Sequence, residues 1–577
     1  MKTGGTQTMK KKTFRRFLSL ALAAGMVMSL TACGPSSNAE SQQPDSQSGQ
    51  SGGENSQKPD GSQGGTSAGG SLTEVTELFA HSASVKHDSI TVVAGGDPGN
   101  LLPQETHVSG KEILDSVFDK LYVIAGFGGE LLPLVAADLP VDNGDGTYSI
   151  TIRDNVVDSD GNKITAADVV FSYDWLVNNS TPHNMEKYHG AEAVGDYEVR
   201  FTCDPLDGVS DLGNLFAQQY IFSEKAFNDH DFATDPVGSG PYKVASFTAG
   251  SEVRLTARED YWCEGQDYQP SRCCANVKEI VYKILNDASQ QANSMRTGEL
   301  DYSNNLSDTD LPDFLEGGQY ADKFGAFSYM DNLTYWFSLN CSGSSPCSDV
   351  NLRKAIMYAI DASACAAASG NANAELVYDF YNSKYPEVKE AWSTTEDTFY
   401  TNPSLETAKS FLDQSSYSGE ELVLVTQDAP PAAQDVATII ANLLQSIGIN
   451  CKLSVVTAAV WNDVYANDDS FDMLMSMMAS DDYGVVAYSR LLGSGQMRTI
   501  AQADPELERL VTLCNTAATH TDENIQALHD LMIENAYGRG LFAAAKFNVV
   551  STSVTQICNN YKYYILPGSC IFADNQF

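Results

Sequence analysis

A long polar stretch near the N-terminus limits where this chain can fold. Residues 34–71 consist almost entirely of Ser, Gly, Gln, Asn, Pro and Asp. Such a stretch cannot bury enough apolar surface to offset the entropy lost when a chain becomes ordered. We therefore predict a disordered tether over residues 33–82, which would let a folded domain stand off from an anchored N-terminus. Globular patterning begins at about residue 88.

An export signal precedes the tether. An apolar run over residues 17–30 is shorter than the roughly 20 apolar residues that a membrane span requires, and it follows a basic cluster. The run ends in Leu30-Thr31-Ala32-Cys33, which resembles the lipobox of bacterial lipoproteins. That resemblance implies that residues 1–32 are a signal peptide. It also implies that a lipid on Cys33 anchors the protein at the outer face of the cytoplasmic membrane (the periplasmic side in a cell with two membranes). An ordinary signal with an incidental Cys is the alternative. The basic cluster consists of Lys10, Lys11, Lys12, Arg15 and Arg16.

Acidic residues outnumber basic ones. The 577 residues include 75 Asp and Glu against 35 Lys and Arg, a formal net charge of −40 at pH 7. Nucleic acid is not expected as a partner, because binding to its phosphates needs clustered Lys and Arg. Hydrophobic residues make up 42% of the chain. At roughly 100–200 residues per domain, the chain has room for three or more structural units.

The sequence shows no recognisable catalytic or metal-binding motif. Neither H-E-x-x-H nor a phosphate-binding P-loop occurs, and the eight His have no ligand spacing. Residues 158–161, Asp-Ser-Asp-Gly, begin like a calcium loop. Val169 stands where such a loop has Glu, so we predict a turn. We therefore expect a protein that is not an enzyme and that uses neither a cofactor nor a metal.

The cysteines leave two interpretations open. Twelve are present, and eleven remain if Cys33 is lipidated. Export permits disulfides, but their pairing cannot be read from the sequence. A set of buried, unpaired thiols is the alternative.

Strand and helix patterns alternate through the rest of the chain. Residues 89–93 and 147–153 have strand-like patterns, and apolar residues recur at helical spacing over residues 113–123. A further helix is predicted over residues 166–177, because a Thr–Asp capping-box pair starts at Thr165. This mixture predicts an α/β or α+β fold rather than an all-β one.

Residues 235–244, D-P-V-G-S-G-P-Y-K-V, predict a tight turn. Gly238 and Gly240 permit backbone angles that other residues avoid, and Pro241 stops any helix. The segment lacks the G-K-[ST] ending and the following helix of a P-loop. We therefore predict a structural turn, followed by a strand from Tyr242.

This turn is the centre of an ordered set of segments. The set includes G-D-G-T-Y-S-I-T-I-R, E-I-V-Y-K-I-L-N-D, D-V-N-L-R-K-A-I-M-Y-A-I-D and L-E-T-A-K-S-F-L-D. Together they resemble the family 5 extracellular solute-binding proteins, the dipeptide- and oligopeptide-binding components of ABC importers. The resemblance covers about residues 88–577. The segments lie at residues 143–175, 235–262, 279–301, 336–361 and 405–457.

The resemblance implies an α/β fold with two lobes that close as a clamp, of the type II periplasmic-binding-protein kind with an extra subdomain. The clamp would enclose a solute by hinge closure and deliver it to the permease subunits of an ABC transporter. The implied solute is a short peptide, with an oligosaccharide, a metal chelate or another small solute as the alternative. A surface lipoprotein enzyme or a sensory or chaperone-like protein is a third class. We expect a monomer. The implied divisions are lobe I at 83–112, 235–325 and 531–577, the extra subdomain at 113–234, and lobe II at 326–530.

The ligand site implied by the resemblance centres on residues 471–482. Asp481 matches an Asp that pairs with the α-ammonium group of a peptide, a task that suits a buried carboxylate because charge-assisted hydrogen bonds are strong. Asp482, next to it, is an equal candidate on composition. Met477 and Ala479 match positions that pair with the peptide main chain, which would accept many sequences.

Some of the remaining site residues match the family pattern and others depart from it. Trp461 matches an aromatic residue that lines the pocket. Met478 stands where the family usually has Trp, and Met475 stands where some members have an Arg that meets a ligand carboxylate. The Met-rich run is either a pliable pocket wall or a plain buried strand with Met475 and Met477 on one face and Met478 on the other. Across the cleft, one loop matches a segment that pairs with the peptide backbone: His107, Val108 and Ser109.

Overall fold

The computed structural model describes residues 72–103, 110–180, 185–307, 309–371, 373–466, 470–479, 482–492, 497–560 and 564–577. The predicted signal peptide, Cys33 and residues 34–71 of the tether lie outside them. Leu72 is buried, and β1 (Thr73–Glu74) pairs in parallel with β19 (Val554–Ile557). Folded structure therefore already begins inside the range predicted as tether. Over the described ranges, no helix is both long enough and apolar enough to cross a bilayer.

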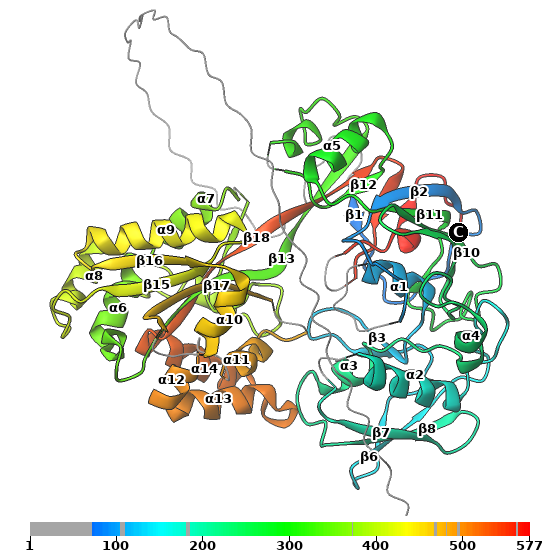
Figure 1. The fold of residues 1–577 in the computed structure, drawn as a ribbon, viewed down its shortest axis with the longest axis horizontal. Coiled ribbons are helices and arrows are strands. Elements are labelled where there is room, and N and C mark those ends of the chain that lie inside the picture. The colour runs from blue at the N-terminus through cyan, green and yellow to red at the C-terminus, as the bar shows by residue number, and fades with distance from the viewer. Residues whose placement is uncertain are drawn as a thin grey trace, which may run out of the picture. The chain divides into compact units, whose positions relative to one another are not determined.

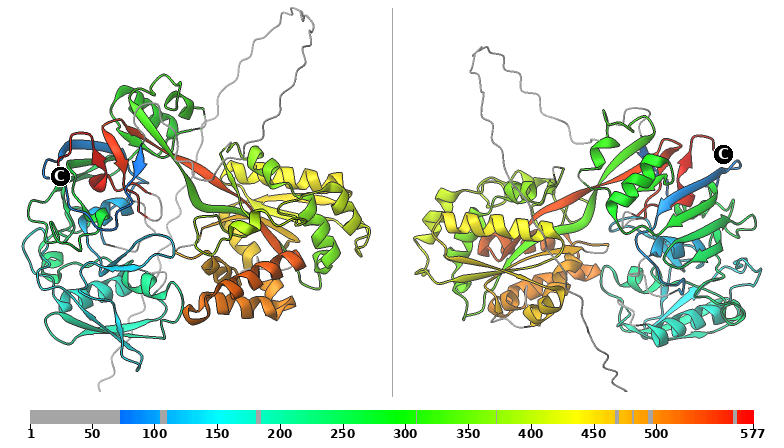
Figure 2. Two further views of the ribbon diagram at one scale, coloured as in Figure 1. Left: turned by 180° about the vertical axis from the view of Figure 1, so that it is seen from behind. Right: turned by 45° about the horizontal axis from the view of Figure 1, so that its top comes forward.

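Eleven strands of the described chain form one sheet. Its order is β16-β15-β17-β13-β18-β12-β2-β11-β10-β9, and β14 pairs with β18 outside this path. Figures 1 and 2 show the two longest strands, β13 (Phe324–Leu339) and β18 (Gly538–Ser551), side by side in its middle. The other strands of the sheet are β2 (His87–Val93), β9 (Tyr242–Thr248), β10 (Glu252–Ala257), β11 (Val277–Lys283), β12 (Tyr302–Ser303), β14 (Glu375–Leu376), β15 (Leu422–Gln427), β16 (Cys451–Val456) and β17 (Met473–Ala479).

The pair β13 and β18 joins the two ends of this sheet. The strands pair antiparallel over most of their length. On the far side of β13 lies β17, and on the far side of β18 lies β12. The register of the pair shifts between Met330 and Thr334 and again between Tyr335 and Trp336. Such irregularities bend a strand and increase its twist.

Smaller sheets and the helices complete the fold (Figure 1). A four-stranded sheet has the order β5-β6-β8-β7, β3 pairs with β4 in a hairpin, and β19 pairs with β20. These strands are β3 (Tyr122–Ile124), β4 (Leu131–Pro133), β5 (Val141–Asp142), β6 (Thr147–Thr151), β7 (Tyr188–Ala193), β8 (Glu198–Cys203) and β20 (Ile571–Phe572). The helices are α1 (Lys111–Val117), α2 (Ala166–Asn179), α3 (Asp211–Phe216), α4 (Glu224–Asp229), α5 (Ala288–Thr297), α6 (Val350–Ala359), α7 (Ala362–Ala368), α8 (Leu405–Leu412), α9 (Pro431–Ser446), α10 (Ala458–Ala466), α11 (Val485–Leu492), α12 (Arg498–Ala503), α13 (Pro505–Asn515) and α14 (Asp522–Asn535).

The hydrophobic core divides into clusters. One packs α1 against β2 and β9 to β11, and a second packs α6, α7 and α9 on β13, β15 and β17. A third lies between α2 and the four-stranded sheet, and a fourth holds α11, α13 and α14 together. Phe118 and Phe222 belong to the first cluster, although their positions are in the predicted extra subdomain. Ala536 and Phe542 belong to the second, although the prediction assigns them to lobe I. The predicted domain division stays a prediction.

Local sequence signals identified several of these elements. The strand β6 and the helix α2 confirm the predicted strand and helix. The capping box is present, because the Thr165 side chain accepts the Asp168 N–H and the Asp168 carboxylate accepts the Thr165 N–H at 2.8 Å. The predicted turn at residues 158–161 is also confirmed, since Asp158 Oδ1 accepts the Asp160 N–H at 3.0 Å.

The helix predicted over residues 113–123 is wrong beyond Val117. The helix α1 ends there, Phe118 is extended, and β3 begins at Tyr122. A contact between distant parts of the chain explains the early end. The Gly240 N–H donates to Val117 O at 2.8 Å, so the glycine turn occupies a carbonyl that the next helical turn would use.

Close approach, rather than unusual backbone angles, explains the two glycines of this turn. A Cβ at Gly238 would lie 2.1 Å from Val117 O, and one at Gly240 would lie 2.7 Å from it. Neither glycine has a positive φ, so the reason predicted from the sequence was wrong. The buried Arg258 holds the turn from the other side, because its guanidinium donates to Gly240 O at 3.2 Å and to Asp158 O at 2.9 Å.

The cysteines beyond Cys33 are buried free thiols, which matches the second of the two interpretations. They are Cys203, Cys263, Cys273, Cys274, Cys341, Cys347, Cys365, Cys451, Cys514, Cys558 and Cys570.

Gly238→Ala is expected to lower the free energy of unfolding by about 2–3 kcal/mol, because the new methyl group would overlap Val117 O. Urea unfolding followed by circular dichroism measures the change. Gly195→Ala is the control, since a Cβ there meets nothing within 4 Å and its φ is not positive. The control should change stability by less than about 0.5 kcal/mol. Equal effects of the two substitutions would contradict the close-approach explanation.

Candidate functional site

The strand β17 lies at the centre of the predicted site. It pairs antiparallel with β13 from Met473 to Ala479, whereas its parallel partner β15 pairs only with Met473 and Leu474. Among the described strands, none pairs with the other edge of residues 475–479. Residues 476–479 are also only partly buried, while the first part of the strand is buried. The C-terminal part of β17 therefore presents an open edge with its main-chain groups toward the surroundings.

Side chains on the two faces of β17 have different surroundings. Met475 lies in the hydrophobic cluster with α6, α7 and α9, and Met477 packs against that cluster. Met478 packs instead against the cluster of α11, α13 and α14. This alternation is the one expected of a strand with Met475 and Met477 on one face and Met478 on the other.

Trp461, on α10, lies beside the Met478 face of β17. Its side chain is 4% exposed and packs in a cluster with Leu474, which shares that face with Met478 by the two-residue period. The structure thus brings Trp461 and Met478 to one side of the strand and places Met477 on the other. The predicted role of Trp461 in a ligand pocket stays a prediction.

Several predicted site residues lie outside the described residues: Asp481, His107, Val108 and Ser109. The alternative anchor, Asp482, is described and is 4% exposed. Its carbonyl oxygen accepts the Gly128 N–H at 2.7 Å. A Cβ built at Gly213, on α3, would lie 3.0 Å from Asp482 Oδ2. Asp482 is therefore packed into the fold against α3 and the turn between β3 and β4.

Glu387 is a buried acid that contacts the start of α11. It is 1% exposed, and its Oε1 accepts the Val485 N–H at 3.2 Å, at the N-terminus of α11. Burial raises the pKa of Glu387, whereas the hydrogen bond from the Val485 main chain lowers it. The carboxylate ties residues 482–485 to a distant segment of the chain. No spacing pattern could have revealed it, because about a hundred residues separate the two partners.

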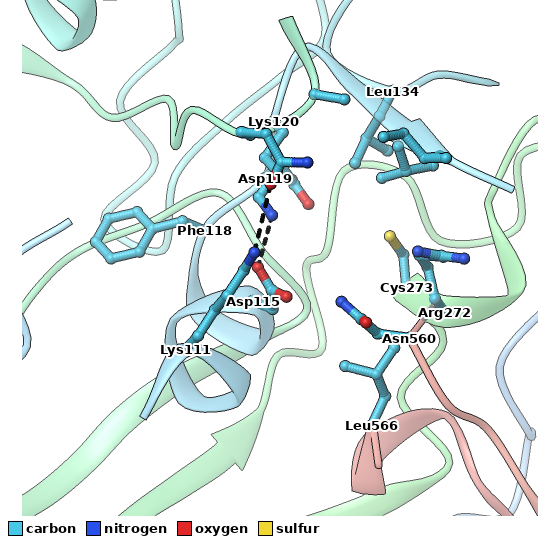
Figure 3. Close-up of a pocket in the computed structure, with 14 residues that line it drawn as sticks. Lys111, Asp115, Phe118, Asp119, Lys120, Leu134, Arg272, Cys273, Asn560 and Leu566 are labelled. Carbon is cyan, nitrogen blue, oxygen red and sulfur yellow. Dashed lines mark hydrogen bonds and ion pairs between the residues drawn. The ribbon is translucent and has the colours of Figure 1, made fainter. Parts of the chain in front are cut away.

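A small cavity lies beside α1, with a volume of about 40 Å³ (Figure 3). Figure 3 shows Lys111 and Asp115 on one side of it and Arg272 and Asn560 on the other. Lys120, just past the end of α1, also lines the cavity. The further lining residues are Phe118, Asp119, Val123, Ile124, Leu134, Ala217, Gln218, Cys273 and Leu566.

An ion pair organises one wall of this cavity. Lys120 Nζ lies 2.8 Å from Asp115 Oδ1, and the hydroxyls of Tyr220 and Tyr564 also donate to Asp115. Burial opposes ionisation of Asp115, but Lys120 and Lys111 outweigh it and hold the pKa of this carboxyl well below its usual range. Asp115 is therefore charged at neutral pH.

The opposite wall carries Arg272, on the short 3₁₀ helix Ser271–Cys273. Its side chain is half-buried. Over the part of the chain that the structure describes, the Arg272 guanidinium has no hydrogen bond and no ion pair. Lys111, Lys120 and Arg272 were not predicted as a group, because Arg272 lies far from the two lysines in the chain and the three form no motif.

The described residues include no group of three or more His, Cys, Asp or Glu side chains arranged to hold a metal ion. What the geometry offers is recognition: an open strand edge on β17, acids close to its end, and a cavity lined by cationic side chains.

Comparison with known proteins places these features in a family. The family model of the bacterial extracellular solute-binding proteins, family 5 (Middle), matches residues 130–498. The oligopeptide-binding protein AppA of Bacillus subtilis (strain 168) is 24% identical over 343 residues, which are 54% of this chain and 58% of that protein. The chain thus spans little more than half the length of this curated relative.

Two solved structures show the same fold at low identity. The oligopeptide-binding protein AppA from Bacillus subtilis, in complex with a nonapeptide, aligns with a TM-score of 0.61 at 16% identity, covering 85% of this chain and 100% of that one. NikA from Brucella suis, in complex with Fe(III)-EDTA, aligns with a TM-score of 0.65 at 19% identity, covering 84% and 99%. The predicted two-lobed α/β fold is confirmed. Because the family model matches well over half of the chain, this protein belongs to the bacterial extracellular solute-binding proteins of family 5.

Proposed function

We propose that this chain captures a short peptide outside the cell and delivers it to the permease subunits of an ABC importer, without catalysing a reaction. The observation that carries the proposal is the open edge of β17 at residues 475–479. An extended peptide that adds to such an edge gains main-chain hydrogen bonds, whatever its side chains are. Met477 and Ala479 would supply those bonds, as the resemblance implies.

The peptide's ammonium group would be anchored next to this edge. Asp481 follows directly after the end of β17, and Asp482 follows Asp481. The packing of Asp482 against Gly213 and its contact with Gly128 give it a structural task. We therefore assign the anchor to Asp481. Glu387 would support it by fixing the start of α11.

A different solute on the same fold is the second candidate. NikA is similar in fold, and its structure holds Fe(III)-EDTA, a chelate rich in carboxylates. The cavity beside α1, with Lys111, Lys120 and Arg272 in its lining, favours an anionic group of this kind. Oligosaccharides and other small solutes remain alternatives without a specific feature in their favour.

The protein would work at the cell surface as a monomeric lipoprotein. The basic cluster, the short apolar run and Leu30-Thr31-Ala32-Cys33 support export and a lipid on Cys33. The polar stretch that follows would tether the clamp at the outer face of the cytoplasmic membrane. Residues 83–112, 235–325 and 531–577 would form most of lobe I, 326–530 most of lobe II, and 113–234 the extra subdomain.

A series of di- to hexapeptides, sugars and metal chelates tests the solute by thermal unfolding and calorimetry. Peptides are expected to raise the unfolding midpoint, because a ligand that binds only the native state stabilises it. Acetylation of the peptide N-terminus should abolish the shift. A shift with a sugar or a chelate and with no peptide would replace the peptide proposal by the second candidate.

Asp481→Asn should weaken peptide binding by about 1–3 kcal/mol, since it removes the charge that pairs with the ammonium group. Calorimetric titration measures the loss. Asp463→Asn, at an exposed position on α10, is the matched control and should bind like the wild type. A loss in Asp482→Asn together with normal binding by Asp481→Asn would move the anchor to Asp482.

Pairing of the peptide main chain with β17 can be tested on the ligand side. A set of peptides, each methylated at one backbone nitrogen, should lose about 1 kcal/mol at alternate positions, because alternate N–H groups of an added strand face its partner. Methylation at the intervening positions serves as the control. Equal tolerance at every position would contradict strand addition at this edge.

A further inference from the structure

The cavity beside α1 concentrates positive charge in a strongly acidic protein. The chain has only 35 Lys and Arg against 75 Asp and Glu. Three of those bases, Lys111, Lys120 and Arg272, nevertheless line one cavity of about 40 Å³. Lys111 is 5% exposed, so the cost of burying its charge must be offset by neighbouring groups.

The acids in the lining do not balance these three charges. Asp115 is ionised and already engaged by Lys120, Tyr220 and Tyr564. Asp119 accepts hydrogen bonds from Trp262 Nε1 at 2.7 Å and from the Tyr261 hydroxyl at 3.2 Å. Burial raises the pKa of Asp119, which disfavours its charge. The lining therefore holds three cationic side chains against two carboxyl groups, and both carboxyl groups are already engaged by other residues.

Arg272 can offer the N–H donors of its guanidinium to a ligand. Its guanidinium makes no hydrogen bond or ion pair with the rest of the described chain, and it borders the cavity opposite α1. A guanidinium presents its N–H groups in a planar fork that fits a carboxylate with two hydrogen bonds. The cavity volume of about 40 Å³ exceeds the roughly 10–15 Å³ that a single water needs, so there is room for a small group such as a carboxylate.

The cavity lining and Asp482 contact a common residue of α3. Ile124 lines the cavity, and its Cδ1 would lie 3.2 Å from a Cβ built at Gly213. That same Cβ position is 3.0 Å from Asp482 Oδ2. Ile124 and Asp482 thus meet at Gly213, so the cavity is separated from the segment after β17 by a single layer of side chains.

We propose that this cavity is a subsite for a carboxylate group of the solute, with Arg272 as its hydrogen-bond donor and Lys111 and Lys120 supplying positive charge. The proposal rests on the proposed function, that of a solute-capturing protein. The carboxylate could come from the C-terminus of a peptide or from a polycarboxylate chelate. Both sources share the chemistry that Arg272 recognises.

Calorimetry on the mature protein tests the subsite with three probes: the tightest-binding member of the di- to hexapeptide series, the same peptide as its C-terminal amide, and EDTA with and without Fe(III). The variants are Arg272→Gln and, as the matched control, Arg200→Gln on β8, whose side chain is 40% exposed. The free acid should bind the wild type about tenfold more tightly than the amide, a difference of about 1.4 kcal/mol. Arg272→Gln should reduce that ratio to about one, and Arg200→Gln should leave it unchanged.

The outcomes separate the subsite from the proposed function. If free acid and amide bind equally while N-acetylation still abolishes binding, the carboxylate subsite is overturned and the peptide proposal stands. If no peptide binds but EDTA or its iron chelate does, and Arg272→Gln weakens it, the subsite stands and the peptide proposal fails. A ratio that survives Arg272→Gln, or no binding of any probe, overturns the subsite. The unfolding midpoint of each variant without ligand shows that its fold is intact.

Discussion

The pairing of β13 with β18 is the interaction on which the rest of the fold depends. About two hundred residues separate these strands in the sequence, yet they supply the centre of the eleven-stranded sheet. Every strand on one side of the sheet reaches the other side only through them. The pair also determines the candidate site, because β17 is held by β13 along its whole length and by β15 only at its start. An open edge at residues 475–479 follows from that difference in partner length, with no special residue needed to create it.

A second, more local constraint shapes the surroundings of α1. The glycine turn approaches Val117 so closely that the helix must end there. Ending the helix at that point leaves Asp115 on its last turn and Lys120 just beyond it, where the two form their ion pair. Arg258 keeps the turn in place by bonding its carbonyl oxygens. The close approach of the glycine turn to Val117 thus sets the positions of Asp115 and Lys120 in the cavity, although neither glycine is part of the cavity lining.

Features that are determined by neighbouring residues could be predicted from the sequence, whereas features that are determined by contacts between distant segments could not. The capping box at Thr165, the strand β6 and the two faces of β17 follow from short-range rules, and the structure shows them as expected. The end of α1 was missed because a turn more than a hundred residues later causes it. The cations of the cavity and Glu387 were missed for the same reason, since each gains its meaning from partners far away in the sequence. The ordered family motifs predicted the two-lobed fold, which local rules could not do, because their resemblance to the family extends over most of the chain. The predicted anchor Asp481 and the loop at His107 lie outside the described residues.

The three recognition features fit one kind of solute better than they fit any other. A peptide presents an ammonium group, a main chain of alternating donors and acceptors, and a carboxylate, and these are common to every peptide sequence. An acid after β17, an open strand edge and a cavity lined by cationic side chains match those three in kind. None of them reads a side chain, so a protein built this way would discriminate by the spacing of charges and accept varied sequences. A chelate such as Fe(III)-EDTA would use the cations alone and leave the strand edge without a partner. Of the two candidates, only a peptide could pair with the strand edge, so this edge is the feature that weighs most heavily between them.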